Sequence, residues 1–89
     1  MINLNEVFLI GKIITEIEFK FIIHSKNIEI AKFEIITLSD EQVIHIVAYN
    51  EMADFVYRRL NKNDIICING YIESNNIIIK KIDIVKSID

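Results

Sequence analysis

The sequence has no proline and no tryptophan, and it has only two glycines and one cysteine among its 89 residues. The single cysteine, Cys67, cannot form a disulfide within the chain, which fits a protein of the reducing cytoplasm. Residues 1–7 contain no basic segment followed by an apolar run, so a secretory signal peptide is not expected. Uninterrupted apolar runs are too short for a transmembrane helix. We therefore expect a cytoplasmic protein that does not enter the membrane.

Acidic residues outnumber basic ones, 13 to 10, which gives the chain a formal net charge of −3. Proteins that bind nucleic acid usually carry a basic surface, because neutralising phosphates releases counterions. The overall charge therefore argues against a strong polyanion binder, and only a local cluster of basic residues would restore the attraction. The sequence also shows no glycine-rich phosphate loop, no Ser–His–Asp arrangement and no cluster of residues at metal-ligand spacing. We expect no enzyme activity, no cofactor, no metal ion and no small-molecule substrate.

What the sequence has in abundance is isoleucine, which accounts for 23 of the 89 residues. Hydrophobic residues make up 52% of the chain, which is enough for a core, and disorder is not expected. β-Branched side chains fit a pleated, half-buried surface, so this composition favours a sheet. A chain of 89 residues suits one compact domain, and we expect residues 1–89 to form a single one.

Hydrophobic and polar residues alternate along much of the chain, which is the pattern of strands with one buried face. Ala31, Phe33 and Ile35, for example, fall on the same face of a strand. The first strand is long enough to require a bend, and Gly11 is the expected place for it. Polar segments rich in serine, asparagine and aspartate separate these runs and predict turns. The expected strands are residues 6–21, 28–38, 42–49, 65–73 and 77–86.

Between the third and fourth expected strands, the pattern changes to helical spacing. Asn50 is a residue type that caps helices, and Glu51 and Asp54 place acid in the first turn, where the helix dipole favours it. Apolar side chains with helical spacing follow, namely Met52, Phe55, Val56 and Leu60. Three strands, a helix and two strands are the layout of the OB-fold, a Greek-key barrel. We therefore predict an all-β protein, a five-stranded OB-fold barrel with one α-helix between strands 3 and 4.

Four segments of the chain carry a family pattern in the same order and spacing. Residues 5–13 read Asn-Glu-Val-Phe-Leu-Ile-Gly-Lys-Ile, and residues 18–21 read Glu-Phe-Lys-Phe. Residues 31–35 read Ala-Lys-Phe-Glu-Ile, and residues 49–72 contain Ala-Asp, Leu, Lys and Ile-Asn-Gly-Tyr-Ile in register with the same pattern. Together they resemble bacterial single-stranded DNA-binding proteins, in a minimal form without the family's C-terminal tail. The resemblance covers nearly the whole chain.

The resemblance implies sequence-tolerant binding of single-stranded DNA in replication, repair or recombination, with RNA as an open alternative. Tyr49 falls at a family position where an aromatic ring stacks on a base. Lys20, His45 and Lys62 match basic positions of the family and are expected to hold phosphates. Further candidates for phosphate contacts lie on other strands, namely Lys12, Lys32 and Lys80. We expect the DNA to lie across the barrel face with at least one base on Tyr49.

Each of these residues also has a purely structural interpretation. Tyr49 would then pack against the start of the helix, and the lysines would keep the strand edges soluble. Arg58 and Arg59 form a dense basic cluster with Lys62, but at the end of a helix such arginines complement the helix dipole. Cys67 has no partner at ligand spacing and is expected to be an inert thiol in the core or in an interface.

Departures from the family pattern favour a second hypothesis, an OB-fold protein-interaction or assembly module with weak or no nucleic-acid binding. The connections at residues 39–41 and 74–76 are short where the family has long hairpins, and the family's tryptophans have no counterpart. The net charge is negative as well. A positive stripe through Lys20 and His45 would support DNA binding, whereas an acidic or apolar face would support the second hypothesis.

The first expected strand carries an apolar stripe on its outward phase, at Phe8, Ile10 and Ile14. An exposed stripe of this kind needs cover. Members of the resembled family dimerise through this strand. We therefore expect a homodimer or homotetramer joined through the first strand.

Overall fold

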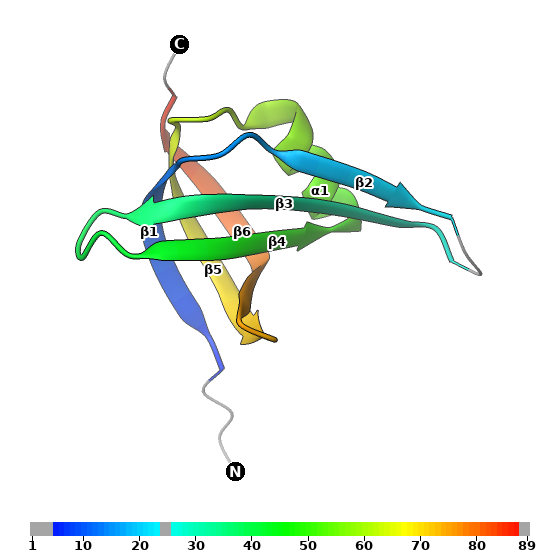
Figure 1. The fold of residues 1–89 in the computed structure, drawn as a ribbon, viewed down its shortest axis with the longest axis horizontal. Helices are drawn as coiled ribbons and strands as arrows, with labels where there is room; N and C mark the ends of the chain where they lie inside the picture. The colour runs from blue at the N-terminus through cyan, green and yellow to red at the C-terminus, as the bar shows by residue number, and fades with distance from the viewer. Residues whose placement is uncertain (1–4, 24–25, 88–89) are drawn as a thin grey trace.

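The computed structural model describes residues 5–23 and 26–87 of the chain. Figure 1 labels the strands and the helix in chain order. The strands are β1 (Val7–Ile13), β2 (Glu18–Ile22), β3 (Ile28–Thr37), β4 (Val43–Tyr49), β5 (Ile65–Glu73) and β6 (Asn76–Lys86), and the helix is α1 (Asn50–Arg59). No helix within the described residues is both long and apolar enough to cross a membrane.

The strands close into a barrel. β1 pairs with β5, β5 with β6, β6 with β4 and β4 with β3, and β3 returns to the end of β1. These pairings are antiparallel except that of β4 with β6, which is parallel. β2 pairs with the other half of β3, so β1 and β2 together act as one barrel strand. The predicted fold is therefore confirmed: a five-stranded OB-fold barrel with the helix between its third and fourth strands.

The first barrel strand is interrupted at residues 14–17, whereas the sequence predicted one unbroken strand over residues 6–21. At the break, the N–H of Ile14 donates to the carbonyl oxygen of Glu34 over 2.9 Å. The N–H of Glu34 in turn donates to the hydroxyl of Thr15 over 2.9 Å. A side-chain hydroxyl thus replaces one backbone acceptor of the sheet at the point where the first barrel strand changes from pairing with β5 to pairing with β3. The alternation of side chains continues beyond the break, so the sequence pattern does not reveal it.

Gly11 does not lie at this interruption, which comes after the end of β1 at Ile13. Gly11 lies instead where β1 meets two strands at once, opposite Thr37 of β3 and Ile66 of β5. A β-carbon here would lie 2.8 Å from the carbonyl oxygen of Ile36 and 2.9 Å from the side chain of Ile35. The glycine therefore permits close packing of the strands at a place where a β-carbon would not fit without a shift.

Asn5 ties the segment before β1 to the sheet. Its side-chain NH₂ group donates to the carbonyl oxygen of Ile72, and its amide oxygen accepts the N–H of Ile72, both over 3.0 Å. The side chain of Asn5 therefore imitates a peptide group and extends the pairing of β1 with β5. The asparagine that opens the resembled pattern has a structural role in this chain.

The prediction that Asn50 caps the helix is wrong. Asn50 is the first residue of α1, and its φ of 53° lies in the left-handed region that asparagine tolerates better than most residues. Its side-chain oxygen accepts the backbone N–H of Glu29 in β3 at 3.3 Å. Tyr49 occupies the cap position and makes no side-chain hydrogen bond to the helix. The side-chain oxygen that could cap the helix is thus hydrogen-bonded to β3.

The helix closes one end of the barrel by packing on β3 and β4 (Figure 1). Ala53, Val56 and Leu60 are buried in this contact. Met52 and Phe55, which the spacing also places on the apolar face, are only half-buried. The helix therefore turns a narrower apolar stripe to the barrel than its sequence suggested.

The core of the barrel consists mainly of isoleucine side chains. Ala31, Phe33 and Ile35, predicted to share one face, are all buried. Fully buried isoleucines from the other strands pack against them, among them Ile13, Ile46, Ile66 and Ile68. Burying one such side chain contributes about 1.5–3 kcal/mol. The high isoleucine content thus supplies the hydrophobic stabilisation of a very small domain.

Two hairpin turns are short, as the sequence predicted. Ser74 and Asn75 have φ values of 50° and 68°, the backbone of a two-residue turn whose twist matches its strands. In the β3–β4 turn, the hydroxyl of Thr37 donates to the carboxylate of Asp40 and accepts the N–H of Gln42. Neither connection is long enough to form a flap over the outer face of the barrel.

Candidate nucleic-acid interface

β2 and the start of β3, residues 18–22 and 28–32, pair with each other and extend beyond the end of β4 (Figure 1), and we call this segment the arm. Where the arm meets β4, Lys20, Ile30 and Tyr49 lie side by side on three neighbouring strands. Because directly opposite residues on paired strands point to the same side of a sheet, all three side chains share one face, and the exposure of Lys20 and Tyr49 shows that it is the outer face. We call these three residues the platform.

Tyr49 presents its ring to solvent. Its exposed fraction is 39%, and Lys20 is also exposed, while Ile30 between them is half-buried. A tyrosine buried in the core is therefore excluded. An exposed ring near an ammonium group is the combination that a base and its phosphate require.

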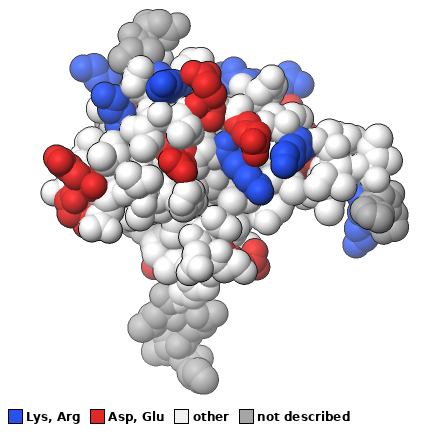
Figure 2. All heavy atoms as spheres, in the orientation of Figure 1, with Lys and Arg blue, Asp and Glu red and all other residues white. Residues whose placement is uncertain are grey.

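Beside the platform, the outer face contains a hollow of about 400 Å³. Three carboxylates line it, those of Glu16, Glu18 and Glu34, together with Lys32 and His45. In Figure 2, red and blue spheres are intermixed across the middle of the visible face. We call this feature the acidic hollow, because its carboxylates outnumber its lysine.

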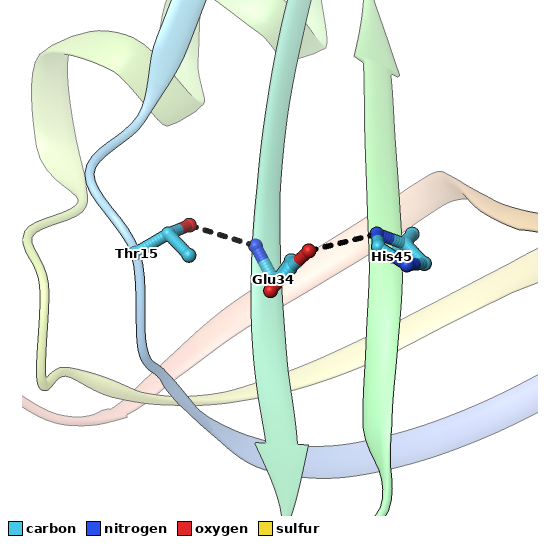
Figure 3. A network of polar contacts seen from close by, with 3 residues as sticks. All are labelled: Thr15, Glu34 and His45. Atoms are coloured by element: carbon cyan, nitrogen blue, oxygen red, sulfur yellow. Dashed lines mark hydrogen bonds and ion pairs between the residues drawn. The ribbon is translucent and has the colours of Figure 1, made fainter.

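The predicted phosphate contacts in the acidic hollow have carboxylate neighbours. His45 lies directly opposite Glu34, and its Nδ1 is 3.0 Å from the Oε2 of Glu34 (Figure 3). Lys32 lies opposite Glu18 of β2. A phosphate at either position would have to compete with a carboxylate. Lys20 therefore supplies a positive charge, but carboxylates lie beside His45 and Lys32, so a continuous positive stripe does not run through Lys20 and His45.

Lys12 lies at a different place, the end of the barrel where the α1–β5 connection meets β1. On the outer face it neighbours Ile65 of β5, and Lys86 of β6 lies on the far side of Ile65. Lys62 is in the α1–β5 connection, which is tied to β1 by a bond from the N–H of Asn63 to the carbonyl oxygen of Ile13 over 2.7 Å. In Figure 2, blue spheres gather along the corresponding upper edge. We call Lys12, Lys62 and Lys86 the basic edge.

Sequence reasoning did not select Lys86, because only the pairing of β5 with β6 brings it near Lys12. Lys80, in contrast, does not join the other candidates. It lines a separate hollow between α1 and β6, together with Glu51, Phe55 and Lys81. The structure therefore divides the seven predicted residues among three places, the outer face beside the arm, the basic edge and the side of the helix.

Arg58 and Arg59 are engaged within the helix. The Nε of Arg58 lies 2.9 Å from the Oδ1 of Asp54, one turn earlier. The guanidinium of Arg59 lies over the ring of Phe55, 5.8 Å from its centroid. These contacts agree with the structural interpretation of the two arginines.

The exposed aromatic ring of Tyr57 escaped the sequence analysis. Tyr57 of α1 is 55% exposed, and its ring stacks on Phe19 of β2 with centroids 4.8 Å apart and planes at 28°. Tyr57 lies outside the apolar spacing of the helix, so no local pattern linked it to the arm. Its ring lies against Phe19, which points to the side of β2 opposite that of Lys20.

Among residues 5–23 and 26–87, no group of three or more histidine, cysteine or acidic side chains is arranged to hold a metal ion.

Neither a protein-family model nor a curated protein sequence matches this chain. Solved structures do match it. The SSB domain of a Synechococcus protein has a TM-score of 0.78 at 13% identity, over 92% of this chain and 97% of its own. The mitochondrial single-stranded DNA-binding protein Rim1 of S. cerevisiae has a TM-score of 0.77 at 16% identity, over 97% of this chain and 99% of its own. The single-stranded DNA-binding protein of Thermus aquaticus reaches 0.82 at 14% identity, over 94% of this chain and 41% of its own.

The fold is that of single-stranded DNA-binding domains. Because the sequence identities are so low, the likeness concerns the architecture alone. The chemistry of the site therefore has to be inferred from the side chains of this chain. In this OB-fold, the platform and the basic edge offer a ring and positive charge, and the acidic hollow lies on the same outer face as the platform.

Proposed function

We propose that this OB-fold domain binds single-stranded DNA without sequence preference, as a binding module and not as an enzyme. The observation that carries the proposal is the platform, where Tyr49 is 39% exposed and the exposed Lys20 lies two strands away, with Ile30 of β3 between them. A base would stack on Tyr49, and its phosphate would lie near Lys20. A flat ring accepts any base, which accounts for sequence tolerance. Such a module would serve replication, repair or recombination in the cytoplasm, where the thiol of Cys67 stays reduced.

The binding is expected to be weak and sensitive to salt. Few aromatic rings face the strand, and Lys32 and His45 share the acidic hollow with three carboxylates. The basic edge adds phosphate contacts only if the strand is long enough to reach it. Separate titrations with fluorescently labelled oligo-dT and oligo-rU at two salt concentrations test the proposal. The oligo-rU titration tests RNA as the alternative ligand. Absence of binding to both at low salt would reject the proposal.

Replacing Lys20 with alanine is expected to weaken DNA binding and to reduce the salt dependence of the affinity. Each phosphate contact on a single strand contributes about 0.7 to the slope of log K against log salt concentration, so the slope should fall by about that amount. Lys80→Ala is the matched control, because Lys80 lies beside the helix and away from the platform. Equal effects of the two variants would show that only the total charge matters.

A second candidate function, a protein-interaction or assembly module, is favoured by two observations. The acidic hollow opposes a polyanion, and the arm exposes large apolar side chains beyond the platform. Phe21 is 53% exposed and Ile22 is 37% exposed. This candidate predicts no oligo-dT binding at low salt, so the titration above separates it from the first.

We also propose that two or more copies join through β1. β3 pairs with β1 only from Gly11 onward. Among the described residues, the part of β1 before Gly11 therefore pairs with β5 on one side, and on its other side it accepts one bond, from the N–H of Leu38 to the carbonyl oxygen of Ile10. Beside this edge Phe8, Ile10 and Leu38 line a hollow of about 410 Å³. Phe8 is 67% exposed. A free strand edge next to exposed apolar side chains is what a second copy would cover.

Phe8→Asp is expected to convert the oligomer to a monomer, because it places a charge in the apolar contact. Light scattering at micromolar concentration measures the mass of both proteins. Val43→Asp is the matched control, since Val43 is a similarly exposed apolar residue (52%) on β4. A wild-type protein of monomer mass would reject the proposed contact through β1.

A further inference from the structure

The pairing of Glu34 with His45 lies at the centre of the outer face. The two residues are direct partners on β3 and β4, and their side chains meet with 3.0 Å between Nδ1 of His45 and Oε2 of Glu34 (Figure 3). The His45 side chain is 62% exposed and that of Glu34 is 34% exposed. Both groups can therefore interact with a ligand that crosses this face.

Other charged groups face the same hollow from the neighbouring elements. Glu16 comes from the connection between β1 and β2, Glu18 comes from β2, and Lys32 comes from β3. Asn76, the residue of β6 that lines the hollow, is uncharged. With a neutral His45, three carboxylates therefore stand against one lysine, which leaves two negative charges uncompensated.

We propose that Glu34 limits the affinity of this face for single-stranded DNA, and that the charge state of His45 makes the binding depend on pH. The inference rests on the proposed function and adds a reason why binding at the face is weak. Histidine is the side chain that commonly changes its charge between pH 5 and pH 8. A proton on His45 lowers the uncompensated charge of the acidic hollow from two to one, which reduces the repulsion of phosphates.

Removing the charge of Glu34 has the same electrostatic effect without any change in pH. A glutamine at this position keeps an oxygen that can accept the Nδ1–H of His45, so the variant removes the charge and preserves the pairing. Glu34→Gln is therefore expected to bind more tightly than the wild type. A gain of affinity is informative, because a variant that merely folds poorly would lose affinity.

The experiment measures binding of labelled oligo-dT at pH 6 and pH 8 in low salt, with four proteins. The wild type is expected to bind more tightly at pH 6 than at pH 8, by at most about three- to fivefold, the effect of one whole exposed charge. Glu34→Gln should gain a similar factor at pH 8. His45→Gln should lose the difference between the two pH values that the wild type shows; His24 is present in every protein, so this comparison isolates His45.

Glu41→Gln is the matched control, because it removes one carboxylate from the exposed β3–β4 turn, outside the acidic hollow. It should bind like the wild type at both pH values. Binding that is present but unchanged or weakened in Glu34→Gln, or equally strengthened in Glu41→Gln, would overturn the inference and leave the proposed function standing. No binding by any of the four proteins at pH 6 would overturn both.

Discussion

Tyr49→Ala is expected to weaken the binding of single-stranded DNA by about five- to hundredfold, because stacking of one base on an aromatic ring contributes about 1–3 kcal/mol. The ring stands 39% exposed at the end of β4 and its loss opens no cavity in the core. Fluorescence anisotropy of labelled oligo-dT at low salt measures the effect. Tyr49→Phe should bind nearly as tightly as the wild type, since it keeps the ring.

Tyr57→Ala provides the matched control for this experiment. It also removes an exposed tyrosine ring, but one that belongs to α1 and stacks on Phe19. Its affinity for oligo-dT should stay within about twofold of the wild type at a temperature where both are folded. If Tyr49→Ala binds as tightly as the wild type, Tyr49 is not a stacking residue and the platform is not the centre of the site.

Gly70→Ala is expected to have the largest effect on stability. A β-carbon at this position would lie 2.1 Å from the carbonyl oxygen of Ile78 on the neighbouring strand. The contact is with backbone, which cannot move aside without breaking the pairing of β5 with β6. The free energy of unfolding should fall by about 3 kcal/mol or more. For a domain of this size, that corresponds to a decrease in Tm of at least about 12 °C.

Thermal unfolding followed by circular dichroism measures this loss, and Gly11→Ala makes an instructive comparison. At Gly11 the closest approach would be 2.8 Å, so the second variant should be destabilised less than the first. Neither glycine has a positive φ, so space and not backbone conformation decides both outcomes. A Tm of Gly70→Ala equal to that of the wild type would show that β5 and β6 are not paired in this register.

The candidate interface combines an attractive part and a repulsive part on one face of the barrel. The platform offers a ring and a lysine, and the acidic hollow next to it carries three carboxylates. A strand that binds at the platform therefore meets repulsion as it continues across the face. The strength and the salt dependence of binding should reflect this difference more than the net charge of the chain does.

Much of the fold follows from local patterns. The alternation at residues 31–35 predicted the buried face of β3, and the helical spacing that begins after Tyr49 predicted α1. Both were readable because they depend on residues close together in the chain. The interruption at residues 14–17 was not readable, because it depends on a bond from Glu34 to Thr15 across strands. For the same reason Asn50 was misassigned as a helix cap, since its amide is held by Glu29.

The candidate site was predictable only in part. The match to the family pattern selected Tyr49 and Lys20 as binding residues, and in the structure both lie on the outer face. It gave no means to foresee that Lys80 would lie beside the helix or that Lys86 would lie near Lys12. Such neighbours depend on which strands pair and in which register, and local sequence does not specify that.

By itself, then, the sequence determined the fold class and the architecture of the barrel, because hydrophobic periodicity and turn residues act over a few positions. Only the tertiary structure decided the electrostatic character of the outer face. Glu34 and His45 face each other because β3 and β4 pair in one register, and a shift by one residue would turn their side chains to opposite sides of the sheet. Charges attract or repel according to distance in space, and that distance is set by the folded chain.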